Sequence, residues 1–210
     1  MENNQSNGLG EFGPKFAVTH PRGGVFWVRP ARFDEIEELH DLIVSEISPA
    51  VGPAEGMRAV HQRNPIVFWR IEAADSGHEN VRAAGMFALL PLTADGVEAL
   101  RKGTLNRREP QLELVAPAGT KPAALYVWAI VAKHIGRLSY PVIKRGLGPL
   151  YADVPCYAIP ITAGGAKAVT DRGFRPVEGA EQSLGGLTLL PVTNFEEQVP
   201  AIDVIVASGP

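Results

Sequence analysis

The sequence predicts an α/β domain, in which a mixed, mostly antiparallel central sheet carries helices on both faces. Two runs rich in β-branched and aromatic residues, 66–73 and 81–90, flank the turn cluster 75–77 and predict an antiparallel hairpin. Residues 124–132 are the most apolar stretch, which is typical of a central strand covered on both sides. After that stretch strands and helices alternate, and this order predicts right-handed crossovers and parallel neighbouring strands.

Residues typical of helix N-termini and C-termini locate the remaining elements. Asp34, with Glu37 three residues later, resembles a capping box at the start of the first helix. Thr93 and Thr162 are expected to cap two later helices, and Gly103 to end the first of these. In chain order we expect strands at 16–20 and 25–29, helices at 34–47 and 54–63, the hairpin strands, a helix at 94–102, strands at 111–115 and 124–132, a helix between 137 and 147, a strand at 154–161, a helix at 163–172, and strands at 174–177, 187–192 and 203–207.

Composition excludes several classes of protein. A net charge of -3 over 210 residues gives no electrostatic footprint for nucleic acid, so we expect no nucleic-acid partner. No apolar run is long enough to cross a bilayer, and residues 1–13 lack the basic-then-apolar order of a signal peptide, so we expect a cytoplasmic protein without a membrane partner. Cys156 is the single cysteine and is expected to be a small buried hydrophobe. The five histidines are scattered, so we expect no metal site.

Three segments carry a resemblance to a known family. They are Val-Arg-Pro-Ala at 28–31 before the capped helix, the strand run 124–132 leading into residues 133–138, and Arg-Gly-Phe-Arg-Pro-Val at 172–177. In this pattern residues 25–192 resemble the GCN5-related N-acetyltransferases. The resemblance implies the acyl-CoA N-acyltransferase fold, with a parallel pair of strands that splay apart around the acyl-CoA. Residues 1–24 are then an N-terminal arm and residues 193–210 a C-terminal extension.

The resemblance also implies a pyrophosphate-binding loop for acetyl-CoA. The family's loop reads Gln or Arg, two residues, Gly, one residue, and Gly or Ala; here Lys133, Gly136 and Leu138 occupy those places. Backbone N–H groups and the N-terminus of the following helix would face the anion. Leu138 departs from the small residue of the pattern, and Pro141 removes one hydrogen bond early in the helix. The cofactor-binding residues implied in this way are Ala129, Ile130, Val131, Lys133, His134, Ile135, Gly136, Arg137 and Leu138.

Catalytic groups are less clear in the sequence, because the position of the family's usual tyrosine is Val169. Tyr157, on the strand after the central one, is the preferred general acid, and Tyr151 in the preceding loop competes for that role. Glu72 is either a general base that acts through water or a surface residue of the hairpin. Tyr126 and Trp128 share one face of the central strand and either line the acceptor site or belong to the core.

Two functional hypotheses follow. The first is an N-acyltransferase that moves an acetyl group from acetyl-CoA to a small-molecule or peptide amine. The second is an acetyltransferase-like domain that has lost catalysis and serves as a CoA-binding or protein-interaction module. The acceptor would be held by the first two helices and by residues 92–110. The apolar segment near the C-terminus suggests an edge strand that either the chain itself or a second subunit covers, and the second alternative predicts a homodimer.

Overall fold

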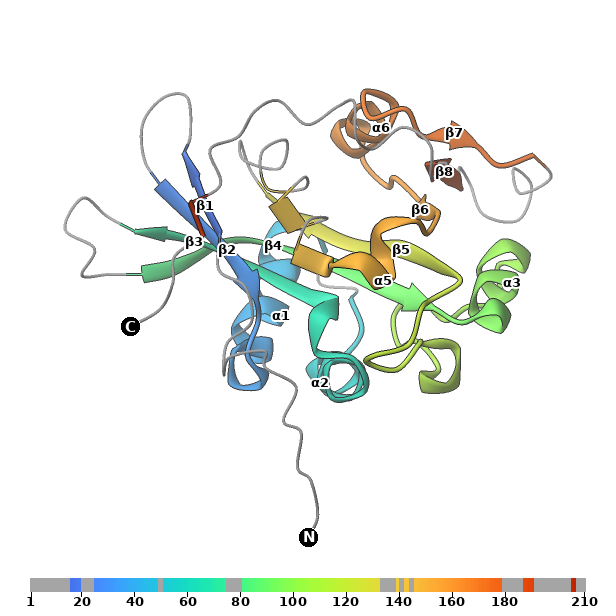
Figure 1. Cartoon of the computed structure of the whole chain (residues 1–210), viewed down its shortest axis with the longest axis horizontal. Helices are drawn as coiled ribbons and strands as arrows, with labels where there is room; N and C mark the ends of the chain where they lie inside the picture. Colours follow the sequence, from blue (N-terminus) through green and yellow to red (C-terminus); the bar gives the residue numbers. More distant parts are fainter. Residues whose placement is uncertain are drawn as a thin grey trace, which may run out of the picture.

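The computed structural model of the chain describes residues 16–19, 25–48, 51–74, 81–132, 139, 142–143, 146–178, 187–190 and 205–206. Its centre is a nine-stranded mixed sheet in the order β7-β8-β6-β5-β4-β3-β2-β1-β9 (Figure 1). The strands are β1 Phe16–Thr19, β2 Val25–Pro30, β3 Phe68–Ala74, β4 Val81–Leu92, β5 Ala124–Val131, β6 Cys156–Ala158, β7 Arg175–Pro176, β8 Thr188–Leu190 and β9 Ile205–Val206. The α/β class and the mostly antiparallel sheet that the sequence predicts are confirmed.

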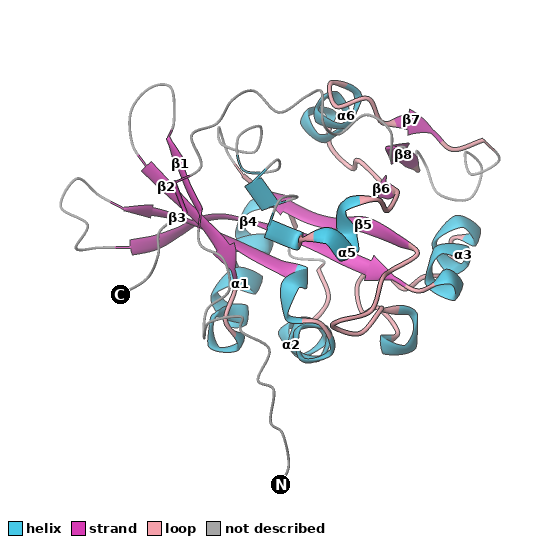
Figure 2. Cartoon of the chain, in the orientation of Figure 1, coloured by secondary structure: helices cyan, strands magenta, loops and turns pink. Residues whose placement is uncertain are grey.

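Helices and short 3-10 turns connect the strands (Figure 2). The α-helices are α1 Ile36–Glu46, α2 Ala54–Arg63, α3 Ala94–Lys102, α5 Pro149–Ala152 and α6 Ala163–Thr170, and the 3-10 turns are η1 Phe33–Glu35, η2 Pro65–Val67 and η3 Leu112–Leu114. Residues 142–143 and 146–147 are also helical, within the range where the sequence predicts a helix after the central strand.

Local capping signals are confirmed for two helices. The Thr93 hydroxyl accepts from the Gly96 N–H at 3.1 Å and caps α3, which ends at Gly103 with a φ of 72°. The Thr162 hydroxyl accepts from the Gly165 N–H at 3.0 Å and caps α6. Each hydroxyl satisfies a donor that a helix start leaves without a partner, so the two helices begin where the threonines place them.

The expected cap at Asp34 is wrong. The chain already turns as a 3-10 helix at Phe33, and α1 begins at Ile36. The Glu35 carboxylate, not that of Asp34, accepts from a backbone N–H at this start, that of Arg32 at 2.8 Å. Glu35 is held in place because its carboxylate also binds the buried Arg29 guanidinium.

The expected strand at 111–115 is also wrong. Residues 112–114 form η3, and Val115 makes one isolated antiparallel bridge to Leu92. The Leu114 carbonyl accepts from the Thr93 N–H at 3.0 Å. Residues 112–114 therefore contact the end of β4 but do not pair along it as a strand.

Strand pairing is antiparallel at every contact described except one. β5 and β6 run parallel, whereas β8 lies between β6 and β7 and is antiparallel to both. The prediction of parallel neighbours therefore holds for β5 and β6 but not for the last strands, because β8 returns between them. At the other edge β9 pairs with β1, which confirms the expected edge strand near the C-terminus.

Two apolar cores lie on the two faces of the sheet. One packs α1, α2 and α3 against the sheet and includes Leu39, Met57 and Phe68. The other packs residues 142–154 against the opposite face and includes Trp69 and Cys156. Cys156 is buried, as expected for a small hydrophobe. In the view of Figure 1, α1 and α2 lie below the sheet and α5 lies in front of it. We call these two sides the α1 face and the α5 face.

Candidate active site at the divergence of strands β5 and β6

The two parallel strands stay paired only at their beginnings. Their register partners are Leu125 with Cys156, Tyr126 with Tyr157, and Val127 with Ala158, where β6 ends. β5 continues to Val131, so residues 128–131 have no strand partner on the β6 side within the described part of the chain. Ile130 in this stretch is 42% exposed, although it belongs to a central strand. Among the described residues, no strand therefore covers the backbone groups of β5 on this side.

A β-bulge lies at the point of divergence. Ala88 pairs with Ala129 and the next residue, Leu89, pairs with Val127, so Trp128 is an extra residue on β5. A bulge bends the strand and turns its backbone groups away from the regular ladder. The Trp128 ring packs against Phe68 on the α1 face, with ring centroids 5.7 Å apart. The bulge therefore bends β5 where it leaves β6.

Two tyrosines stand side by side just before the bulge. Tyr126 and Tyr157 are register partners, and both belong to the core on the α1 face. Within the described residues the Tyr157 hydroxyl has no hydrogen-bond partner. A phenol in this position is able to donate a proton to a group bound beside β5.

Tyr126 has a charged neighbour. Burial raises the pKa of Tyr126, and this effect outweighs the opposing effect of the nearby Arg107 side chain. Trp128 also contacts Arg107, because its indole Nε1 donates to the Arg107 carbonyl at 2.5 Å. The segment after α3 is thereby held beside the site.

Tyr151, the competing candidate, lies on the other side of the sheet. Its side chain is buried in the core on the α5 face. Its hydroxyl accepts from Asn64 Nδ2 at 3.2 Å, and the same amide donates to the Ala116 carbonyl at 3.0 Å. Asn64 is fully buried, and its Oδ1 accepts from the Ile66 N–H at 3.3 Å. Tyr151 thus joins a structural hydrogen-bond network, and the sheet separates it from Tyr157.

Glu72 is not a surface residue. It is buried, and its carboxylate accepts from Arg29 Nη2 at 2.5 Å and lies 3.3 Å from Arg70 Nε. Along β3 it lies four positions, about 13 Å, from Phe68 and two positions, about 7 Å, from Arg70. Phe68 pairs through Ala88 with Ala129, and Arg70 pairs through Met86 with Val131.

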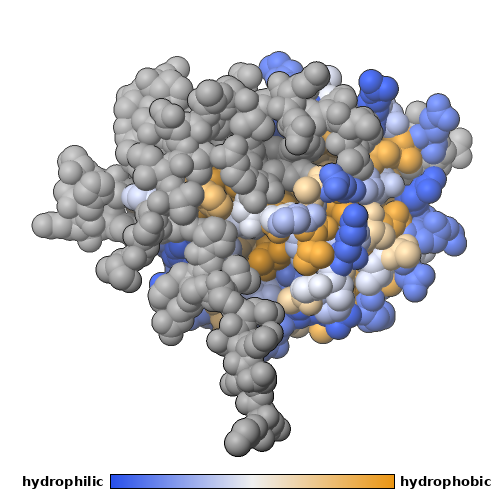
Figure 3. All heavy atoms as spheres, viewed as in Figure 1, coloured by the Kyte–Doolittle hydropathy of each residue, from blue (hydrophilic) through white to orange (hydrophobic). Residues whose placement is uncertain are grey.

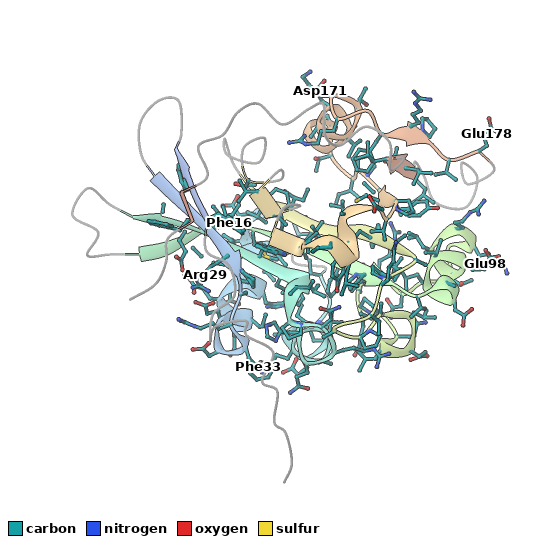
Figure 4. The ribbon with its side chains drawn as sticks, in the orientation of Figure 1. Phe16, Arg29, Phe33, Glu98, Asp171 and Glu178 are labelled. Carbon is teal, nitrogen blue, oxygen red and sulfur yellow. The ribbon has the colours of Figure 1, made fainter. Side chains whose placement is uncertain are left out.

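Glu72 belongs to a buried ion network between β2, β3 and the start of α1. Arg29 binds both Glu72 and Glu35, and Arg70 binds Glu38 of α1. Burial alone would raise the pKa of Glu35, but hydrogen bonds from Arg29 and the Arg32 N–H, with the charges of Arg29 and Arg70, hold it at about 2. Burial would lower the pKa of Arg29, and its hydrogen bonds and ion pairs to Glu35 and Glu72 raise it instead. Every described member of the network is engaged in holding α1 to the sheet. Figure 4 shows Arg29 on β2, on the opposite side of the molecule from Glu98 on α3.

The expected cofactor-binding residues divide into two groups. Ala129, Ile130 and Val131 lie in the stretch of β5 that β6 leaves unpaired. The other six residues of that expectation, 133–138, and also Pro141, lie outside the described residues. Val169, at the position of the family's usual tyrosine, lies in α6 and packs against the core on the α5 face.

The sequence did not single out Arg107 as a site residue, nor did it indicate the bulge at Trp128. The segment 92–110 was expected near the acceptor, but the contact between Arg107 and Tyr126 depends on two segments that the sequence separates. Figure 3 shows hydrophilic and apolar residues side by side over the described part of one face of the molecule.

Comparisons with known proteins add no relative. No protein-family model matches the chain, and no curated protein sequence is significantly similar to it. Within the described residues no three histidine, cysteine or acidic side chains are placed to hold a metal ion. No described helix has the length and apolar character needed to cross a membrane.

Proposed function

We propose that the protein is an acyl-CoA-dependent N-acyltransferase that moves an acetyl group from acetyl-CoA to a primary amine by direct attack. The fold would be that of the GCN5-related N-acetyltransferases. One observation carries the proposal: β5 and β6 pair in parallel for three residues and then separate, with a bulge on β5 at that point. This gap exposes backbone donors and acceptors in the middle of a sheet, where pairing normally satisfies them.

An extended ligand with amide groups suits this gap. The pantetheine arm of acetyl-CoA carries two amides and would pair with the backbone of residues 128–131, as an added strand does. Residues 133–138 follow directly and include Lys133 and Gly136, which would meet the pyrophosphate. The order of groups along the chain therefore matches their order along the acetyl-CoA molecule.

The chemistry needs few side chains. The amine nitrogen attacks the thioester carbonyl carbon, a C–N bond forms, and the C–S bond breaks. Backbone N–H groups near Ala129 to Val131 would stabilise the oxyanion. Tyr157 would give its proton to the leaving CoA thiolate and regain one from the amine through solvent. Glu72 has no part in this scheme, because two arginines engage it.

A second function is favoured by one observation. Val169 occupies the position of the family's usual tyrosine and packs against the core, so that position supplies no proton donor. If Tyr157 does not replace it, the protein is a CoA-binding or protein-interaction module without turnover. The acyltransferase and the CoA-binding module share the binding step and differ in catalysis, whereas a protein-interaction module needs neither.

A titration with acetyl-CoA tests the binding step, with ADP and ATP as controls for nucleotide binding alone. At about 100 times its dissociation constant the ligand should add roughly 2.7 kcal/mol of stability and raise the thermal midpoint by several degrees. Lys133→Glu should weaken this shift. Lys121→Glu is the matched control, because Lys121 is exposed and lies before the other end of β5.

Turnover is then followed as free CoA released with a panel of primary amines. Binding with amine-dependent CoA release supports the acyltransferase. Binding without release over the whole panel supports the non-catalytic module. No shift at millimolar acetyl-CoA in wild type excludes the acyltransferase and the CoA-binding module, and leaves a protein-interaction role.

A further inference from the structure

We infer that Arg107 selects the acceptor, and that the acceptor is a small amine that also carries a carboxylate. The inference rests on the proposed function for the role of the amine, but the carboxylate site is defined by residues of its own. Arg107, Tyr126 and Trp128 form that site, which we call the Arg107 site.

The Arg107 main chain is fixed on both sides. Its carbonyl accepts from Trp128 Nε1 at 2.5 Å. The neighbouring Arg108 N–H and Glu109 N–H both donate to Asn106 Oδ1, at 3.1 and 3.3 Å. This turn therefore holds the loop in one conformation beside β5.

The loop also packs closely on the connection between α1 and α2. A Cβ added at Gly52 would lie 1.9 Å from the Arg108 carbonyl oxygen, so the two backbones meet where only glycine fits. The Gly52 carbonyl in turn accepts a hydrogen bond with His40 Nε2 at 3.0 Å. An arginine on a loop held in this way loses little conformational entropy when it binds a ligand.

The Arg107 guanidinium lies beside the Tyr126 hydroxyl and has no carboxylate partner within the described residues. Two exposed glutamates of α3 and α1 form pairs of their own. Glu98 pairs with Lys102 at 3.0 Å, and Glu37 pairs with Arg58 at 2.6 Å. In contrast, the buried arginines Arg29 and Arg70 each have acidic partners. The Arg107 site is thus an exposed guanidinium on an anchored main chain, without a carboxylate partner among the described residues.

The arrangement favours a carboxylate. A guanidinium presents a planar pair of donors that matches two carboxylate oxygens. Because burial raises the pKa of Tyr126, its hydroxyl stays protonated near neutral pH and adds a third donor. The half-buried Trp128 ring provides apolar contact for the carbon skeleton of the ligand.

The spacing to Tyr157 limits the size of the acceptor. Tyr126 and Tyr157 are register partners, so their backbones lie about 4.8 Å apart. An amine that reaches the thioester near Tyr157 would therefore be a few bonds from a carboxylate on Arg107. This separation fits an amino acid or an amine of similar size, and it favours such an acceptor over a long polyamine or a lysine on a protein surface.

The test uses matched sets of ligands: an α-amino acid, its carboxamide and the amine without the carboxylate, together with ethanolamine and phosphoethanolamine. Binding is measured first without acetyl-CoA, by calorimetry and by the fluorescence of the tryptophans. Amino acids should bind roughly 10- to 100-fold more tightly than the matched neutral amines, and Arg107→Met should abolish the difference. Arg108→Met, the adjacent arginine, should keep it.

Acyl transfer provides the second readout. With amino acids, Arg107→Met should raise KM at least tenfold, whereas Arg108→Met should leave KM close to that of wild type. The inference is overturned if amino acids bind no better than their neutral partners, if Arg107→Met keeps the preference, or if phosphoethanolamine binds well and carboxylates do not. Because carboxylate binding is measured without acetyl-CoA, it decides this inference even if acetyl-CoA fails to bind and the proposed function is rejected.

Discussion

Tyr126 and Tyr157 lie side by side on the α1 face, as register partners in the parallel pair formed by β5 and β6. Beyond them β6 ends and β5 continues with a bulge at Trp128. The pair therefore lies one position before Val127 and Ala158, the last residues at which the two strands are joined. A ligand that enters between the strands would come close to these phenols, of which Tyr126 has a charged neighbour and Tyr157 has no hydrogen-bond partner among the described residues.

Substitution of the two candidate tyrosines separates catalysis from structure. Tyr157→Phe should lower kcat roughly 100-fold without weakening acetyl-CoA binding, because it removes the proposed proton donor. Tyr151→Phe should leave kcat unchanged and reduce the free energy of unfolding by about 1 kcal/mol, because Asn64 loses one acceptor. Steady-state kinetics and urea unfolding measure both effects. The reverse result, with catalysis lost in Tyr151→Phe, would place the general acid on the α5 face.

The buried ion network should be essential for stability. Arg29→Met leaves Glu35 and Glu72 buried without their main partner and should cost about 3–5 kcal/mol. Lys102→Met breaks the exposed pair with Glu98 and should cost far less, because solvent screens this pair. Chemical unfolding of the two variants gives the comparison. Equal losses would mean that the network contributes no more than a surface ion pair.

The same network predicts an acid-sensitive step in stability. The pKa of Glu35 in the folded chain is about 2, below its ordinary value of 4.5, so its contribution is present above pH 4.5 and is lost as the pH falls toward 2. The difference of about 2.5 units corresponds to on the order of 3 kcal/mol. The stability advantage of wild type over Glu35→Gln should therefore shrink by about that amount between pH 6 and pH 2. If the difference in unfolding free energy between wild type and Glu35→Gln stays constant with pH, the pKa of Glu35 is not lowered in the folded chain.

Two glycines within helices test how closely α3 and α6 pack against their neighbours. Alanine is usually better than glycine in a helix by about 1 kcal/mol. Gly164→Ala in α6 meets no atom within 4 Å and should gain some of this stability. Gly96→Ala in α3 places its Cβ 2.4 Å from the Leu114 carbonyl oxygen and should instead destabilise the protein. Thermal unfolding of both variants decides the point, and a gain at Gly96 would mean that η3 does not lie against α3.

The parts of the fold that the sequence predicts well depend on neighbours in the chain. Thr93, Thr162 and Gly103 act within one helical turn, so their roles can be recognised from spacing alone. The apolar run that becomes β5 is long enough to identify without its partners.

The features that the sequence could not predict depend on contacts between strands and on where each element lies in the folded chain. Glu72 is buried because Arg29, 43 residues earlier, reaches it across the pairing of β2 and β3. Tyr151 and Tyr157, only six residues apart, fall on opposite faces because α5 and β6 direct them differently. The bulge at Trp128 changes the register of β5 by one residue, and no periodic pattern indicates such a shift.

Amide hydrogen exchange of β5, with and without saturating acetyl-CoA, tests the central claim most directly. In the free protein, the amides of residues 125–127 should exchange slowly, because both neighbouring strands pair there, and those of 128–131 that face away from β4 should exchange faster. Acetyl-CoA should slow exchange at residues 128–131 and leave 125–127 almost unchanged. If acetyl-CoA binds without slowing exchange at 128–131, or slows it nowhere in the chain, the unpaired end of β5 is not the acyl-CoA site.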